Sequence, residues 1–319
     1  MYTLIGGELS LFTRKLEAAL IFYRADFDLV AKITMDEVMV ETRSGTHQVP
    51  VLQTPENWML ADTTPIIAML DARFPQRAMF PDGELGALVH ILEEHLDEWI
   101  ARVMVHYRWH YKDSAAFASV KIAQGDPEAA AQIAQWGPRA CRATGTDSVQ
   151  QQKAAEEEYV RLLHAAEAQL KESAYLLGDR PTALDCIVLG GLRAHTYMDP
   201  DPKKVVSNFP TVVEWAESRA DQWDGTGELA SLPDSTPFAQ HLLSEMAATY
   251  APYVLANRES KAVGARAFHA NIYGEEVSYL TRSYPEISRQ MIVKRIAALE
   301  TQDQMGALLK KYDLSHVFS

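Results

Sequence analysis

Along the first eighty residues the apolar positions follow two periods, which predicts strands alternating with helices. Residues 2–5 form a short apolar run typical of a buried strand. Phe12, Leu16, Leu20 and Tyr23 then recur on one helical face. The chain therefore opens with a strand followed by a helix.

The same region continues with further strand patterns. Residues 29–33 alternate between apolar and polar positions, and residues 51–53 and 58–60 flank the turn-forming residues 54–57, which predicts a hairpin. A helix then runs to Pro75. The expected order is β-α-β, an unassigned segment, and β-β-α.

From Pro81 onward we recognise only helical spacing, so an all-helical second part is expected. Residues 112–150, rich in Ala, Gln and Gly, resemble an insertion with two short helical runs. Thr182 and Asp185 have the spacing of a capping box and are interpreted as structural. The long helices are indicated by two apolar sets: Leu85, Leu88, Leu92, Leu96, Trp99 and Val103, and then Tyr159, Leu162, Leu163, Ala166 and Leu170.

The C-terminal stretch is expected to add helices after a loop at 224–237. We therefore divide the chain into residues 1–80 and 81–319, with 224–319 as a C-terminal helical extension. After Pro285 an apolar helix face must be buried against the helical part or a second subunit. That face comprises Ile287, Met291, Ile292, Ile296 and Leu299.

Charge and cysteine content narrow the class of protein. Thirty Lys and Arg stand against forty-three Asp and Glu, a net charge of −13 that disfavours nucleic acid and anionic membrane surfaces as partners. Cys141 and Cys186 show neither a disulfide framework nor zinc-ligand spacing. No apolar run is long enough to span a membrane and no export signal is visible, so a cytoplasmic protein is expected.

Three loops carry the candidate chemistry. Residues 10–15 join the first strand to the first helix and place the Ser10 hydroxyl where unpaired backbone N–H groups gather. Pro50 stands at the mouth of a strand, and Asp62 and Thr63 stand at another helix start. Each feature alone is more often a cap or an edge-strand proline, whereas their conjunction points to a site that binds an anion.

In this order and spacing, the segments resemble the glutathione S-transferase superfamily. Residues 10–15 (SLFTRK) are similar to its Ser-Pro-Phe-Ser-Arg-Lys loop, Val49-Pro50 to its cis-proline, and Asp62-Thr63 to its Glu-Ser pair. Residues 175–185 are similar to its Gly-Asp-x-x-Thr-x-Ala-Asp signature. The resemblance covers residues 1 to about 222 and implies a thioredoxin-like domain (α/β) followed by an all-α domain.

The resemblance also implies a glutathione-binding transferase. Ser10 would stabilise the glutathione thiolate for attack on an electrophilic small molecule, with Thr13 as a second, lower-ranked hydroxyl. No cysteine or tyrosine takes that place, so cysteine-type thioltransferase and tyrosine-type activation are not supported. Glutathione as co-substrate would contact Phe12, Gln48, Val49, Pro50, Asp62 and Thr63.

Partners and rival functions follow from the same resemblance. A homodimer with a role in detoxification is expected. A non-catalytic glutathione-fold protein for binding or assembly, and a glutathione-dependent isomerase or dehalogenase, remain open as alternatives. The identity of the electrophile and the roles of residues 112–150 and of the extension are left open.

His106 and His110 stand one helical turn apart but lack the Glu that follows the first His in zinc motifs, so no metal is expected. We instead expect His106, Trp109 and His110 to form, with Leu11, an aromatic and polar wall of the electrophile pocket. A plain packing or interface role is the alternative.

Overall fold

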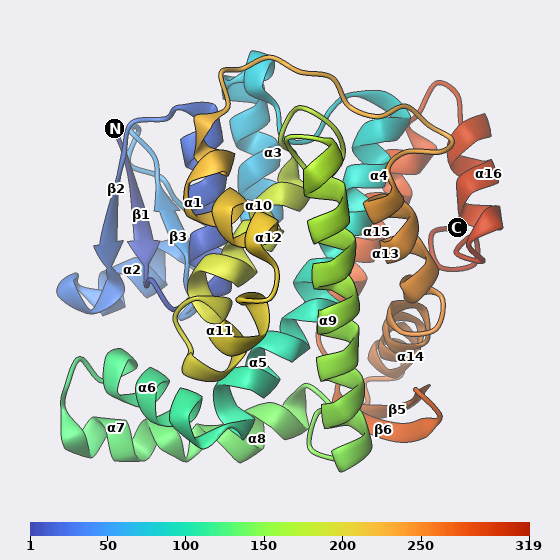
Figure 1. The fold of residues 1–319 in the computed structure, drawn as a ribbon. Coiled ribbons are helices and arrows are strands. Elements are labelled where there is room, and N and C mark those ends of the chain that lie inside the picture. The colour runs from blue at the N-terminus through green and yellow to red at the C-terminus, as the bar shows by residue number, and fades with distance from the viewer.

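The N-terminal region of the computed structural model, which describes all residues 1–319, is a four-stranded sheet flanked by helices (Figure 1). The strand order is β2-β1-β3-β4; β1 and β2 are parallel, and the other pairs are antiparallel. The strands are β1 (Tyr2–Gly6), β2 (Phe27–Ala31), β3 (Val51–Gln53) and β4 (Met59–Ala61), and the helices are α1 (Leu11–Tyr23), α2 (Glu37–Ser44) and α3 (Thr63–Arg73). This arrangement confirms the thioredoxin-like fold, and α2 fills the segment left unassigned.

The helical part packs directly on this sheet through α1. Leu16 and Leu20 are fully buried, as their shared helical face predicts. Helix α10 approaches α1 closely at Gly190, where a Cβ atom would lie 2.6 Å from the carbonyl oxygen of Leu11. A side chain at that position would push the two helices apart.

Nine helices, several extended by π-helical turns, build the central helical layer. Asp185 accepts hydrogen bonds from the backbone N–H groups of Thr182 and Leu176, so the capping interpretation is confirmed. The expected insertion contains three helices instead of two short runs. The nine helices are α4 (Gly83–Glu94), α5 (Ala101–His110), α6 (Lys112–Ile122), α7 (Pro127–Ala134), α8 (Trp136–Ala143), α9 (Val149–Glu172), α10 (Ala183–Gly191), α11 (Pro200–Val206) and α12 (Pro210–Glu214).

The C-terminal extension is not wholly helical, which corrects the sequence interpretation. Strands β5 and β6 of the extension form a hairpin whose residues alternate between exposed and buried. The same alternation is present in the sequence, from which only helices were expected here. Tyr273 and Gly274 form its two-residue turn, both with positive φ. The extension comprises α13 (Pro237–Met246), α14 (Tyr250–Ala262), β5 (Ala267–Ile272), β6 (Glu275–Leu280), α15 (Tyr284–Ala297) and α16 (Asp303–Lys311).

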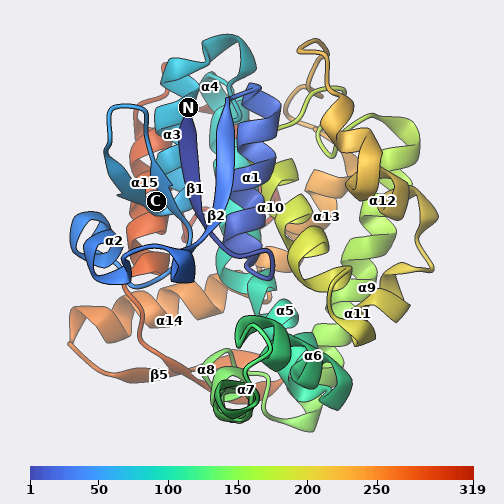
Figure 2. The same cartoon turned by 90° about the vertical axis from the view of Figure 1, so that its left-hand side faces the viewer.

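Helix α15 packs against α4 and α14, and Figure 2 shows α14 below it. Of its predicted apolar face, Ile292 and Ile296 are buried, but Ile287 is exposed. The buried face also carries the ion pair of Glu286 and Arg289, whose guanidinium donates to the carbonyl oxygen of Val317. This polar contact joins α15 to the C-terminal end of the chain. No helix in the structure is long and apolar enough to cross a membrane.

Candidate functional site

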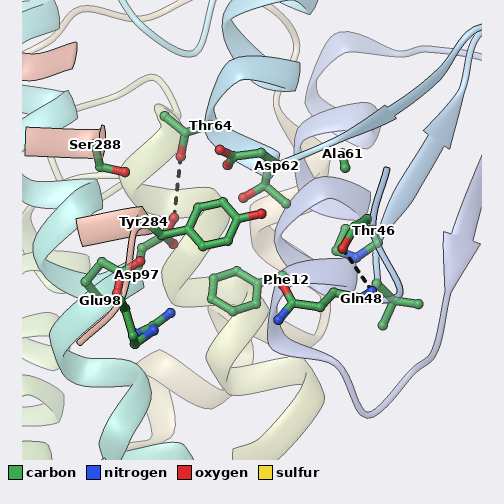
Figure 3. Close-up of a pocket in the computed structure, with 14 residues that line it drawn as sticks. Phe12, Thr46, Gln48, Ala61, Asp62, Thr64, Asp97, Glu98, Tyr284 and Ser288 are labelled. Carbon is green, nitrogen blue, oxygen red and sulfur yellow. Dashed lines mark hydrogen bonds and ion pairs between the residues drawn. The ribbon is translucent and has the colours of Figure 1, made fainter. Parts of the chain in front are cut away.

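One cavity brings together six residues that the resemblance assigns to glutathione binding. This cavity, called the polar pocket below, measures about 90 Å³. It lies between α3, the loop before β3, the π-helical turn that follows α4, and the start of α15. Figure 3 shows Phe12, Gln48 and Asp62 around it. Its lining includes Phe12, Gln48, Val49, Pro50, Asp62 and Thr63.

The backbone has an unusual conformation at two places in the polar pocket. The Val49–Pro50 peptide bond is cis, as the resemblance implies, and neither the N–H nor the C=O of Val49 takes part in a backbone hydrogen bond. Asp62 has a positive φ of 74° and precedes the first turn of α3. Thr63 opens that helix and is buried, but its hydroxyl makes no hydrogen bond within the protein. The pocket therefore offers unpaired backbone and hydroxyl groups at both ends.

Ser10 faces a second and larger cavity of about 710 Å³, called the Ser10 cavity below. The first loop forms one wall with Gly7 and Ser10, and β2 and α6 supply the others. Val49 lines both cavities. Three apolar side chains of the wall stay partly exposed, namely Leu29 at 38%, Ile33 at 58% and Ile122 at 37%.

The two hydroxyls of the first loop have different surroundings. Ser10 is the N-cap of α1, and its Oγ accepts a hydrogen bond from the Thr13 N–H at 3.2 Å. The Ser10 hydroxyl hydrogen therefore remains free to donate. Thr13 is fully buried, and its Oγ1 accepts from the Gly7 N–H at 3.4 Å. A Cβ at Gly6 would lie 2.3 Å from that Oγ1, so Thr13 is packed beneath the loop and lines neither cavity.

Arg108 holds the first loop in place and was not singled out from the sequence. Its guanidinium donates to the carbonyl oxygen of Leu9 at 2.7 Å and pairs with Asp199 at 2.8 Å. Both side chains are buried. Burial lowers the pKa of Arg108, and the pairing with Asp199 opposes that shift. Arg108 stands between Tyr107 and Trp109, and its partners Leu9 and Asp199 are about ninety or more residues away, so no local pattern indicates its role.

The expected electrophile wall does not line the Ser10 cavity or the polar pocket. Leu11 lines a separate apolar cavity of about 40 Å³ between helices of the helical layer. His106 is buried, and its Nε2 lies 2.8 Å from Glu156 of α9. Trp109 packs against Gly137 of α8, and His110 stacks on His106. Helical spacing placed these side chains on one helix correctly, but it did not show which neighbour that helix faces.

A buried ion cluster joins the two halves of the molecule behind the polar pocket. Lys15 of α1 is fully buried and pairs with Glu93 and with Asp97, the latter at 2.5 Å. Thr64 of α3 donates to Glu93 at 2.6 Å. Burial disfavours the charged ammonium, but Asp97 and Glu93 outweigh that effect and hold the pKa of Lys15 above its ordinary value. The cluster thus fixes α1, α3 and the helix after α4 at the pocket floor.

Three residues of the C-terminal extension complete the polar pocket: Arg282, Tyr284 and Ser288. In Figure 3 the Tyr284 ring extends across the pocket between Asp62 and Phe12. Arg282 pairs with Glu98 at 2.8 Å. Burial raises the pKa of Asp62, while the charge of Lys15 opposes and that of Glu93 adds to the rise. These extension residues lie beyond the resembling region, so no sequence signal indicated them.

Comparisons with known proteins agree with this architecture. Residues 4–78 match the glutathione S-transferase N-terminal domain, and residues 129–221 match the glutathione S-transferase C-terminal domain. No curated protein matches the sequence.

Several solved structures resemble parts of this chain. A glutathione S-transferase from Rhodospirillum rubrum F11 is 19% identical, with 76% of this chain and 99% of that chain covered and a TM-score of 0.47. One from Methylobacillus flagellatus KT, solved with glutathione bound, is 16% identical, with 70% and 96% covered and a TM-score of 0.45. One from Methylobacterium radiotolerans JCM 2831, in complex with glutathione sulfonate, is 18% identical, with 70% and 92% covered and a TM-score of 0.45.

The two domain matches together span more than half of the chain, in the order and at the positions where the sheet and the helical layer are found. This protein belongs to the glutathione S-transferase superfamily.

Proposed function

We propose that the protein is a glutathione transferase that activates the glutathione thiol for attack on an electrophilic small molecule. The observation that carries the proposal is the meeting of two cavities at Val49. The polar pocket gathers the six residues assigned to glutathione, and the Ser10 cavity begins on the other side of the same residue. A thiol held near Val49 would therefore face Ser10.

The polar pocket suits the tripeptide backbone. The free N–H and C=O of Val49 would pair with the cysteinyl residue as an added strand does. Gln48 would reach the glycyl end. Thr63 and the N-terminus of α3 would bind the γ-glutamyl carboxylate, and Asp62 would bind its ammonium group.

Thiol activation follows from the position of Ser10. A free thiol has a pKa of about 8.5, so it is mostly protonated at neutral pH. The Ser10 hydroxyl, which accepts from Thr13 and keeps its own hydrogen, would donate that hydrogen to the sulfur and favour the thiolate. The positive end of α1 adds about 0.3–1 kcal/mol in the same direction. The thiolate would then donate an electron pair to the electrophilic carbon and form a C–S bond, while the leaving group departs with the electron pair of the bond that breaks.

The electrophile is proposed to occupy the Ser10 cavity. Its partly exposed apolar side chains, Leu29, Ile33 and Ile122, fit an apolar molecule of drug-like size, since ligand pockets usually measure about 300–1,000 Å³. Helix α6 contributes Ile122, so the segment 112–150 would take part in substrate binding. This proposal replaces the wall expected from Leu11, His106, Trp109 and His110.

One observation favours the non-catalytic alternative. The polar pocket, at about 90 Å³, is smaller than a usual ligand site because Tyr284 crosses it. A glutathione-fold protein that only binds or assembles would need no open pocket. The isomerase and dehalogenase alternatives use the same thiolate and differ only in the electrophile.

A calorimetric titration with glutathione, followed by a conjugation assay with an aryl halide, separates these functions. We expect binding between micromolar and millimolar affinity, about −8 to −4 kcal/mol, together with conjugation. Binding of glutathione and of an S-alkyl analogue without turnover of any electrophile would favour the non-catalytic protein. No heat and no thermal shift at millimolar glutathione would refute the proposed function.

The homodimer, the cytoplasmic location and a role in detoxification remain predictions. Light scattering coupled to gel filtration measures the first directly, because one chain has a mass of 35.7 kDa. A mass of one chain at micromolar concentration would contradict the dimer.

A further inference from the structure

We propose that Arg282 of the C-terminal extension binds a carboxylate group of glutathione, which makes the extension a part of the substrate site. This inference rests on the proposed function, since it concerns the same pocket. It assigns a binding role to a segment that lies outside both domain matches.

The polar pocket is acidic, and a single basic side chain faces it. Its lining includes three acidic residues, Asp62, Asp97 and Glu98, and Arg282 is its single Lys or Arg. Lys15 lies behind the pocket, fully buried and paired with Glu93 and Asp97. Glutathione carries two carboxylates and one ammonium group. An acidic pocket would hold the ammonium, but it would repel a carboxylate wherever no positive group faces it.

Arg282 is held in position before any ligand binds. Its backbone N–H donates to Asn257 Oδ1 at 2.9 Å, and Asn257 Nδ2 donates back to its carbonyl oxygen at 3.0 Å. Asn257 is fully buried in α14. This two-way clamp fixes the chain where β6 ends and α15 begins. A backbone that is already fixed loses less conformational freedom on binding, which favours affinity.

The guanidinium also keeps capacity for a second partner. Glu98 pairs with its Nη1 at 2.8 Å, while the side chain of Arg282 remains 47% exposed. A guanidinium has five N–H donors in a planar fork and can bind one carboxylate on each edge. Glu98 would therefore orient the fork, and the ligand carboxylate would take the exposed edge.

The deciding experiment compares glutathione binding by the full chain and by three variants, using calorimetry. Arg282→Gln should weaken glutathione binding by 10-fold or more, because a charge-assisted contact is lost. Arg282→Lys should retain part of the affinity. Arg266→Gln, which alters an exposed arginine just before β5 that lines neither cavity, should bind as the wild type does.

A second ligand identifies the carboxylate. Glutathione esterified at its glycyl end lacks the charge of the glycyl carboxylate but keeps the γ-glutamyl end. If Arg282 binds the glycyl end, Arg282→Gln should leave the affinity for the ester unchanged; if it binds the γ-glutamyl end, the affinities for both ligands should fall equally. Either result supports the inference, and neither is expected from a merely structural role, provided that thermal unfolding of the variant matches the wild type.

Failure of this inference and failure of the proposed function would give different results. Unchanged glutathione affinity in a folded Arg282→Gln variant would overturn the inference and leave the proposed function standing. A wild-type chain that does not bind glutathione would overturn the proposed function, and the inference with it.

Discussion

The two cavities that meet at Val49 differ in size and in the sign of the charges that line them. The polar pocket is small, is completed by the extension and is lined by three acidic residues and one basic residue, whereas the Ser10 cavity is about eight times larger and has three basic residues and one acidic residue beside its exposed apolar side chains. Charged groups at fixed positions suit one zwitterionic ligand, because each misplaced polar group is left unpaired. Apolar contacts, which the wider cavity offers at Leu29, Ile33 and Ile122, are non-directional and accept many shapes. We therefore expect the tripeptide side to be selective and the electrophile side to be permissive.

The largest expected effect comes from removing residues 237–319, which tests whether the polar pocket needs the extension. The truncated chain should aggregate or lose cooperative unfolding, because residues 237–319 bury side chains such as Phe238, Leu242 and Phe318 in the main core. Each fully buried side chain of this kind stabilises by about 1.5–3 kcal/mol. Solubility and thermal unfolding measure the outcome. A soluble chain with unchanged heat stability would show instead that the extension is an independent tail.

Ser10→Ala tests the junction of the two cavities. The pKa of the bound thiol should rise by about one to two units, and turnover at neutral pH should fall by 10-fold or more, since each unit corresponds to about 1.36 kcal/mol. Ultraviolet absorbance of the thiolate in a pH titration of the complex follows the pKa. Loss of the N-cap should cost about 1 kcal/mol of stability, so thermal unfolding is recorded in parallel.

Thr13→Ala is the matched control in the same loop, because its hydroxyl lies beneath Gly7 and lines neither cavity. The thiol pKa should not change in this variant. A pKa raised by Thr13→Ala but unmoved by Ser10→Ala would transfer the role to Thr13. A pKa unmoved by both would assign activation to the backbone amides of α1.

A pH titration of affinity tests the acidic character of the polar pocket. Burial raises the pKa of Asp62, so this carboxyl becomes neutral at a higher pH than an ordinary aspartate does. An ammonium ligand requires the ionised form, and glutathione affinity should therefore fall as the pH decreases through the raised pKa, by up to about 10-fold per unit. Calorimetry between pH 4 and pH 8 measures the decline.

Asp62→Asn should bind glutathione more weakly at neutral pH and flatten this dependence. Asp97, Glu98, Lys15 and Arg282 also face the region and stay unchanged in that variant. A decline that persists unaltered in Asp62→Asn would assign the titration to another of these groups.

The smallest expected effect concerns the permissive cavity. Ile122→Asp places a charge on its apolar edge and should lower kcat/KM for an apolar aryl halide about five-fold, through KM, while glutathione affinity stays unchanged. Val120→Asp is the control, since Val120 is exposed on the same helix but lines neither cavity. Equal losses in the two variants would mean that the electrophile does not bind against α6.

The outline of the fold could be predicted from the sequence because the signals are local. Helical spacing of Leu16, Leu20 and Tyr23, and the turn between β3 and β4, are set within a few residues. Apolar and polar residues alternate just as locally along β5 and β6, but helices were expected there because helical segments precede and follow the hairpin. The start of α15 was indicated by Pro285, but its contact with the C-terminal end through Arg289 and Val317 joins residues 28 positions apart and has no local signal.

The polar groups on the first three loops can be identified from local sequence alone. Ser10, Pro50, Asp62 and Thr63 stand at helix starts and at the mouth of a strand, where backbone geometry alone leaves polar groups unpaired. Which of these groups face a cavity depends on the tertiary structure. It packed Thr13 beneath the loop, turned His106 toward α9, and brought Arg282 to the pocket from more than two hundred residues away. Contacts between distant segments depend on how whole helices pack, and side-chain spacing along the chain carries no record of that.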